Sequence, residues 1–144
     1  EFKIASIYGM QEYNLPAEKL KELGVTAVYF FGSQAEGSGR KSSDYDIAVL
    51  FDDSKRAYGN TSDIYGKLYD IFSSALDLSG FKNIDIVFIQ SAPLHLQYQI
   101  ITAGRLIYQS DQQGVLKNKE NIMLKYADFA PLREEFNRAV LAKI

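Results

Sequence analysis

Three aspartates stand at the beginnings of segments that have the residue pattern of strands. Asp44 and Asp46 open an alternating segment, and Asp85 is the one charged residue of a later apolar segment. In a strand, residues i and i+2 point to the same side, so Asp44 and Asp46 would lie close together. Two neighbouring carboxylates repel each other, and burying them is costly unless a cation neutralises them or one takes up a proton.

Magnesium is the cation that suits such a group. Mg²⁺ prefers carboxylate, water and phosphate oxygens, and proteins usually hold it with one or two carboxylates together with the phosphates of a substrate. With Asp85 on an adjoining strand, the aspartates could hold two ions, one activating an attacking hydroxyl and one stabilising a leaving pyrophosphate. The group therefore predicts metal-assisted phosphoryl-type transfer, with Asp44, Asp46 and Asp85 as metal ligands and catalytic residues.

A Gly-Ser turn precedes the aspartates. Gly32 and Ser33 directly follow a β-branched and aromatic segment, and ten residues separate them from Asp44. Glycine lets the backbone approach a phosphate closely, and amide and hydroxyl groups at a helix start attract anions. Gly32 and Ser33 are therefore candidates for binding a polyphosphate. The glycine spacing also fits a P-loop, but Ser38 stands where that motif requires lysine.

The surrounding elements must place the turn and the aspartates at one end of a sheet. Hydrophobic periodicity and helix-ending residues define these elements. We expect strands over residues 25–31, 44–51 and 83–89, a short segment over 106–108, and helices over 16–23, from Thr61 or Ser62 to Gly80, over 94–102 and over 112–144 with a break at Pro131. Alternation in the second strand assigns Asp44, Asp46, Ala48 and Leu50 to one face. The order predicts a small α/β or α+β domain with a mixed sheet backed by helices.

Composition limits the classes of function. A chain of 144 residues, 47% of them hydrophobic, is long enough for one domain with a core and too short for two. It has no cysteine, which excludes disulfides, thiolate zinc sites and cysteine nucleophiles. A net charge of −2 argues against broad nucleic-acid binding. No transmembrane or signal-peptide pattern is present, so we expect a soluble, cytoplasmic protein with a small ligand or a protein partner.

Together these residues resemble the nucleotidyltransferases related to DNA polymerase β, and among them the minimal nucleotidyltransferase (MNT) proteins. The resemblance covers residues 25–108. It is carried by Phe31-Gly32-Ser33, Ala35, Gly37, Ser43-Asp44-Tyr45-Asp46-Ile47, Asp85-Ile86-Val87, Pro93, Leu96, Ile100 and Gly104-Arg105-Leu106-Ile107-Tyr108. The resemblance implies the polymerase β-like fold in a single domain over residues 1–144, with residues 112–144 as its helical C-terminal part.

The resemblance also implies a chemistry and a partner. ATP would be the donor, bound with the help of Gly32, Ser33 and Ser43, and two Mg²⁺ ions would be held by the three aspartates, with Asp85 also acting as the base. MntA-type antitoxins of this group partner a HEPN-domain ribonuclease toxin and inactivate it by transferring AMP to a toxin tyrosine.

The phosphate loop departs from the family pattern. Family members often carry arginine in this loop, whereas Gln34 and Glu36 stand here, and an acid does not help to bind a triphosphate. Arg40 and Lys41 could supply the missing positive charge. The departure keeps open a binding module that neutralises its toxin by occlusion. A small-molecule nucleotidyltransferase is a third hypothesis, although a chain of this size has little room for an acceptor site, which favours a protein acceptor or an oligomer.

The end of the chain carries an apolar stripe. Leu132, Phe136, Val140 and Ile144 recur every fourth residue, which places them on one face of a helix. We expect this face to pack on the chain's own domain, with a partner interface as the second hypothesis.

Overall fold

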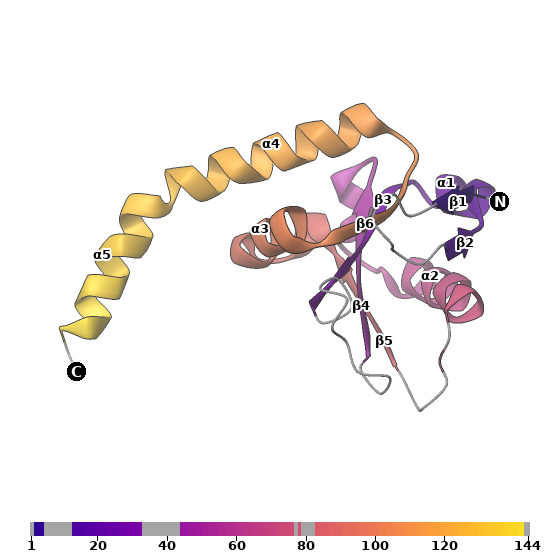
Figure 1. Ribbon diagram of the computed structural model, residues 1–144, viewed down its shortest axis with the longest axis horizontal. Helices are drawn as coiled ribbons and strands as arrows, with labels where there is room; N and C mark the ends of the chain where they lie inside the picture. The colour runs from indigo at the N-terminus through magenta and orange to yellow at the C-terminus, as the bar shows by residue number, and fades with distance from the viewer. Residues whose placement is uncertain (1, 5–12, 33–43, 77, 79–82, 143–144) are drawn as a thin grey trace.

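The computed structural model describes residues 2–4, 13–32, 44–76, 78 and 83–142. A four-stranded sheet with the strand order β5-β4-β3-β6 forms its centre (Figure 1). The strands are β3 (Val25–Phe31), β4 (Tyr45–Phe51), β5 (Ile84–Phe88) and β6 (Arg105–Gln109). β3 is antiparallel to β4 and β6, whereas β4 and β5 run parallel. The predicted mixed sheet is confirmed.

Helices cover both faces of this sheet. They are α1 (Ala17–Glu22), α2 (Ser62–Ala75), α3 (Leu94–Ala103), α4 (Gln112–Asp128) and α5 (Ala130–Leu141), with the short 3-10 helices η2 (Ser54–Ala57) and η3 (Ile89–Ser91). One core cluster joins the sheet to α1 and α2 through Leu20, Leu68 and Phe72. The other joins it to α3 and α4 through Ile100 and Ile122. Within the described part of the chain, no helix is long and apolar enough to cross a membrane.

The alternation predicted for β4 is confirmed. Tyr45, Ile47 and Val49 lie in the core on the α1 and α2 side of the sheet. Ala48 and Leu50 lie in the core on the α3 and α4 side. Because side chains alternate along a strand, Asp46 belongs to the same face as Ala48, at the edge of the α3 side.

Several boundaries differ from the sequence-based expectation, most of them by one or two residues, and two differences have a visible cause. The second long helix, α2, ends at Ala75 instead of continuing to Gly80, because Leu76 is already extended with φ −110° and ψ 152°. The hydroxyls of Ser73 and Ser74 donate to carbonyls one turn earlier, a bond that weakens the end of a helix. β5 ends at Phe88, one residue earlier than expected, because η3 begins at Ile89.

A two-stranded sheet near the N-terminus was missed. β1 (Phe2–Ile4) pairs antiparallel with β2 (Tyr13–Leu15), and each strand has three residues. Strands this short offer too few positions for alternation to stand out in a sequence. Tyr13 packs edge-to-face on Phe30 of β3, with 5.0 Å between ring centroids, and so joins this pair to the main core.

The C-terminal helices form an arm that leaves the body (Figure 1). The predicted break is confirmed: α4 ends before Phe129, two residues ahead of Pro131, which lies in the first turn of α5. The expectation that the stripe packs on its own domain is wrong. α5 is described throughout and contains no buried residue, and Leu132, Phe136 and Val140 are all exposed. Ile144 lies outside the described residues.

Candidate active site

The parallel pairing of β4 with β5 places two of the predicted aspartates side by side. Their register sets Asp46 directly opposite Asp85. The α2 connection makes this pairing possible, because it returns the chain to the end of the sheet where β4 began and lets β5 start there. Residues far apart in sequence are thereby joined at the entrance to two neighbouring strands.

Hydrogen bonds with the backbone of Asn83 hold Asp44 at the N-terminal ends of β4 and β5. The amide of Asn83 donates to Asp44 Oδ1 at 3.0 Å, and the amide of Tyr45 donates to the Asn83 carbonyl at 2.9 Å. Asp44 and Asp85 are exposed, whereas Asp46 is half-buried. The three aspartates therefore lie at one end of the sheet, and one carboxylate is sheltered whereas two face solvent.

The electrostatics of this group centre on Asp46. Burial raises the pKa of the Asp46 carboxyl above its usual range, and the charges of Asp85 and Asp44 raise that pKa further. The negative charge on Asp46 is therefore destabilised by both desolvation and repulsion. A bound cation would relieve both.

The donor atoms fit Mg²⁺, but they do not form a closed cage. Among the described residues, no group of three or more His, Cys, Asp or Glu side chains is arranged to hold a metal ion by itself. Mg²⁺ seldom needs such a group, because it keeps several waters and takes its remaining ligands from one or two carboxylates and from substrate phosphates. The assignment of Asp44, Asp46 and Asp85 as metal ligands stays a prediction that the chemistry of these carboxylates supports.

Gly32 is required at the end of β3 for a reason that the sequence did not reveal. Its φ is +69°, a conformation that side chains other than glycine rarely adopt. A Cβ atom added at Gly32 would lie 2.7 Å from Asp46 Oδ2, closer than a carbon and an oxygen can approach without movement. Gly32 therefore makes room for the sheltered carboxylate. The other predicted donor-binding residues, Ser33, Arg40, Lys41 and Ser43, lie outside the described residues, as do Gln34 and Glu36.

Arg105, which was noted from the sequence only as part of the family motif and not as a site residue, is a cation near the same end of the sheet. It opens β6 opposite Phe30, two residues before Gly32, and its guanidinium lies 5.8 Å from the centre of the Phe30 ring. It forms a side-chain hydrogen bond with Tyr13, whose pKa is raised by burial and partly lowered again by Arg105. Its buried Nε has no hydrogen-bond partner among the described residues.

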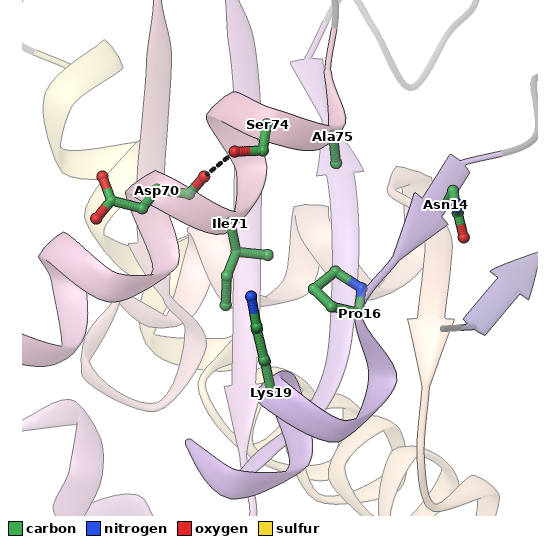
Figure 2. A pocket seen from close by; sticks show the side chains of 7 residues that line it. All are labelled: Asn14, Pro16, Lys19, Asp70, Ile71, Ser74 and Ala75. Atoms are coloured by element: carbon green, nitrogen blue, oxygen red, sulfur yellow. Dashed lines mark hydrogen bonds between the residues drawn. The ribbon is translucent and has the colours of Figure 1, made fainter.

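A separate pocket lies between α1, β2 and α2 (Figure 2). Its volume is about 430 Å³, and it is lined by Asn14, Pro16, Lys19, Asp70, Ile71, Ser74 and Ala75. Lys19 reaches from α1 toward Ile71 of α2, and the Ser74 hydroxyl donates to the Asp70 carbonyl at 3.0 Å. None of the predicted site residues lines this pocket, so we do not assign the catalytic site to it.

Comparison with protein families decides the class of the chain. A sequence model described as "Polymerase beta, Nucleotidyltransferase" matches residues 17–113, which include the three aspartates and Gly32. The chain belongs to this family. The family predicted from the sequence is therefore confirmed.

Individual relatives agree with this assignment. The chain is 32% identical over 89 residues to the protein adenylyltransferase MntA of Shewanella oneidensis, and the match covers 62% of this chain and 58% of that relative. It therefore spans less than two thirds of the relative's length.

Solved structures show the same fold. A chain of a toxin–antitoxin crystal structure with AMP-PNP aligns with a TM-score of 0.66 at 23% identity, covering 87% of this chain and 94% of that one. A chain of the tri-AMPylated Shewanella oneidensis HEPN toxin in complex with its MNT antitoxin aligns with a TM-score of 0.62 at 22% identity, covering 87% and 92%.

Proposed function

We propose that this protein is a Mg²⁺-dependent protein adenylyltransferase that transfers AMP from ATP to a tyrosine of a HEPN-type ribonuclease toxin and so acts as the antitoxin of that pair. The observation that carries the proposal is the register of β4 and β5, which sets Asp85 beside Asp46 in a chain of the nucleotidyltransferase family. A relative named a protein adenylyltransferase and a related complex with a tri-AMPylated toxin support the choice of reaction.

The proposed roles follow from where the side chains lie. Two Mg²⁺ ions would bind at this site. They would neutralise the polyphosphate and the developing charge of the transition state. Asp44 and Asp46 would hold both ions. Asp85 would complete the ligand set and accept the proton of the tyrosine hydroxyl as its oxygen attacks the α-phosphorus and pyrophosphate leaves. Gly32, together with Ser33 and Ser43, would bring the backbone close to the departing phosphates.

We propose that the hydroxyl that accepts AMP belongs to another protein. Asp44 and Asp85 are exposed, so the described part of the proposed reaction centre faces solvent. A macromolecular acceptor can cover such a site and exclude water from it. We propose that residues 1–144 form one nucleotidyltransferase domain with its motif core at 25–108 and its helical part at 112–144, and that it works in the cytoplasm.

The proposal is tested by incubating the protein with α-labelled ATP, Mg²⁺ and purified HEPN toxin. We expect label on a toxin tyrosine, lost when EDTA is added and lost with Asp44→Asn. Asp63→Asn is the matched control, because Asp63 is an exposed aspartate of α2 whose ion pair with Lys67 lies far along the chain from the site. Absence of label on the toxin with the wild-type protein would contradict the proposal.

A second candidate function is neutralisation by occlusion without AMP transfer. It is favoured by Glu36 in the phosphate loop, an acid where a triphosphate would bind. The two functions separate with Asp46→Asn. If this variant suppresses the toxin's ribonuclease activity as well as the wild type does, and no AMP is transferred by either, occlusion is the function.

A further inference from the structure

The bend between α4 and α5 is made at a single residue with nearly helical backbone. Phe129 ends α4 and precedes α5, and its φ of −87° and ψ of −4° lie in the right-handed helical region. The helical hydrogen-bond pattern continues on both sides of it. The Phe129 amide donates to the Lys125 carbonyl at 3.2 Å, and the Arg133 amide donates to the Phe129 carbonyl at 3.0 Å. A modest change of backbone dihedral angles would therefore make one continuous helix of the two.

Pro131 weakens the chain at this junction. It lies in the first turn of α5 and has no amide hydrogen, so the Ala127 carbonyl loses the donor that an uninterrupted helix would provide. Prolines inside helical segments kink them. Because α5 contains no buried residue, core packing does not hold it in its bent direction. Side chains at the junction must do so.

Three side chains from three helices meet at the junction. Tyr98 of α3 stacks on Tyr126 of α4, with 3.8 Å between ring centroids and 8° between ring planes. The guanidinium carbon of Arg133 in α5 lies 3.7 Å from the centroid of the Tyr126 ring. Two groups cannot share one face of a ring at these distances, so Tyr98 and Arg133 lie on opposite faces of Tyr126.

A hydrogen bond adds to this stack. In an uninterrupted helix the Tyr126 carbonyl would accept from the amide of Ala130. Here Nη1 of Arg133 donates to that carbonyl at 2.8 Å. The guanidinium therefore satisfies a backbone acceptor at the bend and covers the ring of the same residue. All three side chains are half-buried, which strengthens a contact between a cation and a ring.

We propose that Tyr98, Tyr126 and Arg133 form a latch that holds α5 bent relative to α4, and that opening the latch lets the two helices straighten into one proline-kinked helix. The latched arrangement is the one in Figure 1, where α5 turns sharply from the direction of α4. On opening, the Tyr126 carbonyl exchanges Arg133 for the Ala130 amide. One hydrogen bond replaces another and α5 has no buried residue to expose, so the stack is the main difference between the two arrangements. The latch thereby sets the direction of the arm, and it does so independently of the proposed reaction.

The test measures the distance between two positions along the arm. The chain has no cysteine, so Gln113→Cys together with Asn137→Cys attaches spin labels at two exposed positions only, one on α4 and one on α5. An uninterrupted helix rises about 1.5 Å per residue and would place these positions about 36 Å apart, whereas the bend brings them closer. Double electron–electron resonance of the labelled protein should give one narrow distribution of distances below that value.

Variants that remove one layer of the stack should open the latch. Arg133→Gln and Tyr98→Leu should each broaden the distribution and shift it toward about 36 Å. Arg138→Gln is the matched control, because Arg138 is an exposed arginine of the same helix whose Nε donates to the Glu134 carbonyl at 3.4 Å. It takes no part in the stack, so its distribution should equal that of the labelled protein without a further change.

The outcomes separate a latch from a bend that the backbone maintains alone. A broad distribution with all three side chains present, or an unchanged one with Arg133→Gln, overturns the latch. A shift with Arg133→Gln but none with Tyr98→Leu also overturns it, because α3 would then take no part. A shift as large with Arg138→Gln would do the same. Circular dichroism should show equal helix content in all these proteins, since α5 buries no residue and the open arrangement stays helical.

Discussion

The end of the sheet and the C-terminal arm hold their important side chains in different ways. At the sheet end, two parallel strands covered on both faces fix Asp46 against Asp85 by register, and a glycine makes room for the sheltered carboxylate. In the arm, helical periodicity gathers apolar side chains on one face, but no element of the described chain covers them. Burial determines the first arrangement within this molecule.

The largest difference between the two regions should appear in activity. Asp85→Asn keeps the size of the side chain but removes a proposed metal ligand and base, so we expect AMP transfer to fall by about 10³-fold or more while toxin binding is unchanged. Leu132→Ala, at an exposed position of α5, should leave the kcat of transfer within about twofold of wild type. Steady-state transfer rates at varied toxin concentration measure both. Equal losses of kcat in the two variants would remove the distinction.

Truncation of a leucine in the core that supports the sheet and of a leucine in the arm should have unequal effects on stability. Leu68 of α2 is fully buried in the core, so Leu68→Ala should lower the free energy of unfolding by about 2–5 kcal/mol. Leu132 of α5 is exposed, so Leu132→Ala should change it by less than about 0.5 kcal/mol. Urea unfolding followed by circular dichroism provides the comparison. A large loss for Leu132→Ala would show that the stripe packs within the chain after all.

Gly32→Ala tests how tightly the turn and the aspartate are coupled. The positive φ and the 2.7 Å approach to Asp46 Oδ2 both oppose a Cβ atom, so we expect a loss of about 1–3 kcal/mol in the free energy of unfolding. Gly59 offers a matched control, since it also has a positive φ, +79°, but an added Cβ would meet no atom within 4 Å. Gly59→Ala should therefore cost less. Equal losses would mean that backbone strain alone explains the effect.

The smallest effect concerns the pH dependence of stability. Because the pKa of Asp46 is higher in the folded than in the unfolded protein, the folded state binds more protons between the two values. Without Mg²⁺, this group should therefore make the protein less stable as the pH rises from about 4 through the raised pKa. Asp46→Asn should remove that loss. Thermal unfolding at several pH values compares the variant with wild type; identical slopes would show that Asp46 is not under this repulsion.

The sequence was sufficient to predict the local pattern of the site, but it did not predict the contacts between its residues. Alternation was sufficient to place Asp46 on the face of Ala48, because both faces of β4 are buried and the pattern is strong. The Asn83 amide that binds Asp44, and the carboxylate that excludes a side chain at Gly32, depend on three-dimensional register between distant segments. The helical period of Leu132, Phe136 and Val140 was visible, but periodicity shows that a face is apolar without showing what covers it.

The central claim is that the aspartates at the entrance to β4 and β5 form a metal-dependent ATP site, and calorimetric titration of ATP tests it most directly. We predict that the wild type and Asp63→Asn bind ATP at least tenfold more tightly with Mg²⁺ than with EDTA, since the ion joins the carboxylates to the phosphates. Asp46→Asn should lose this dependence. ATP binding that ignores Mg²⁺ in the wild type, or that keeps its full Mg²⁺ dependence in Asp46→Asn, would contradict the account.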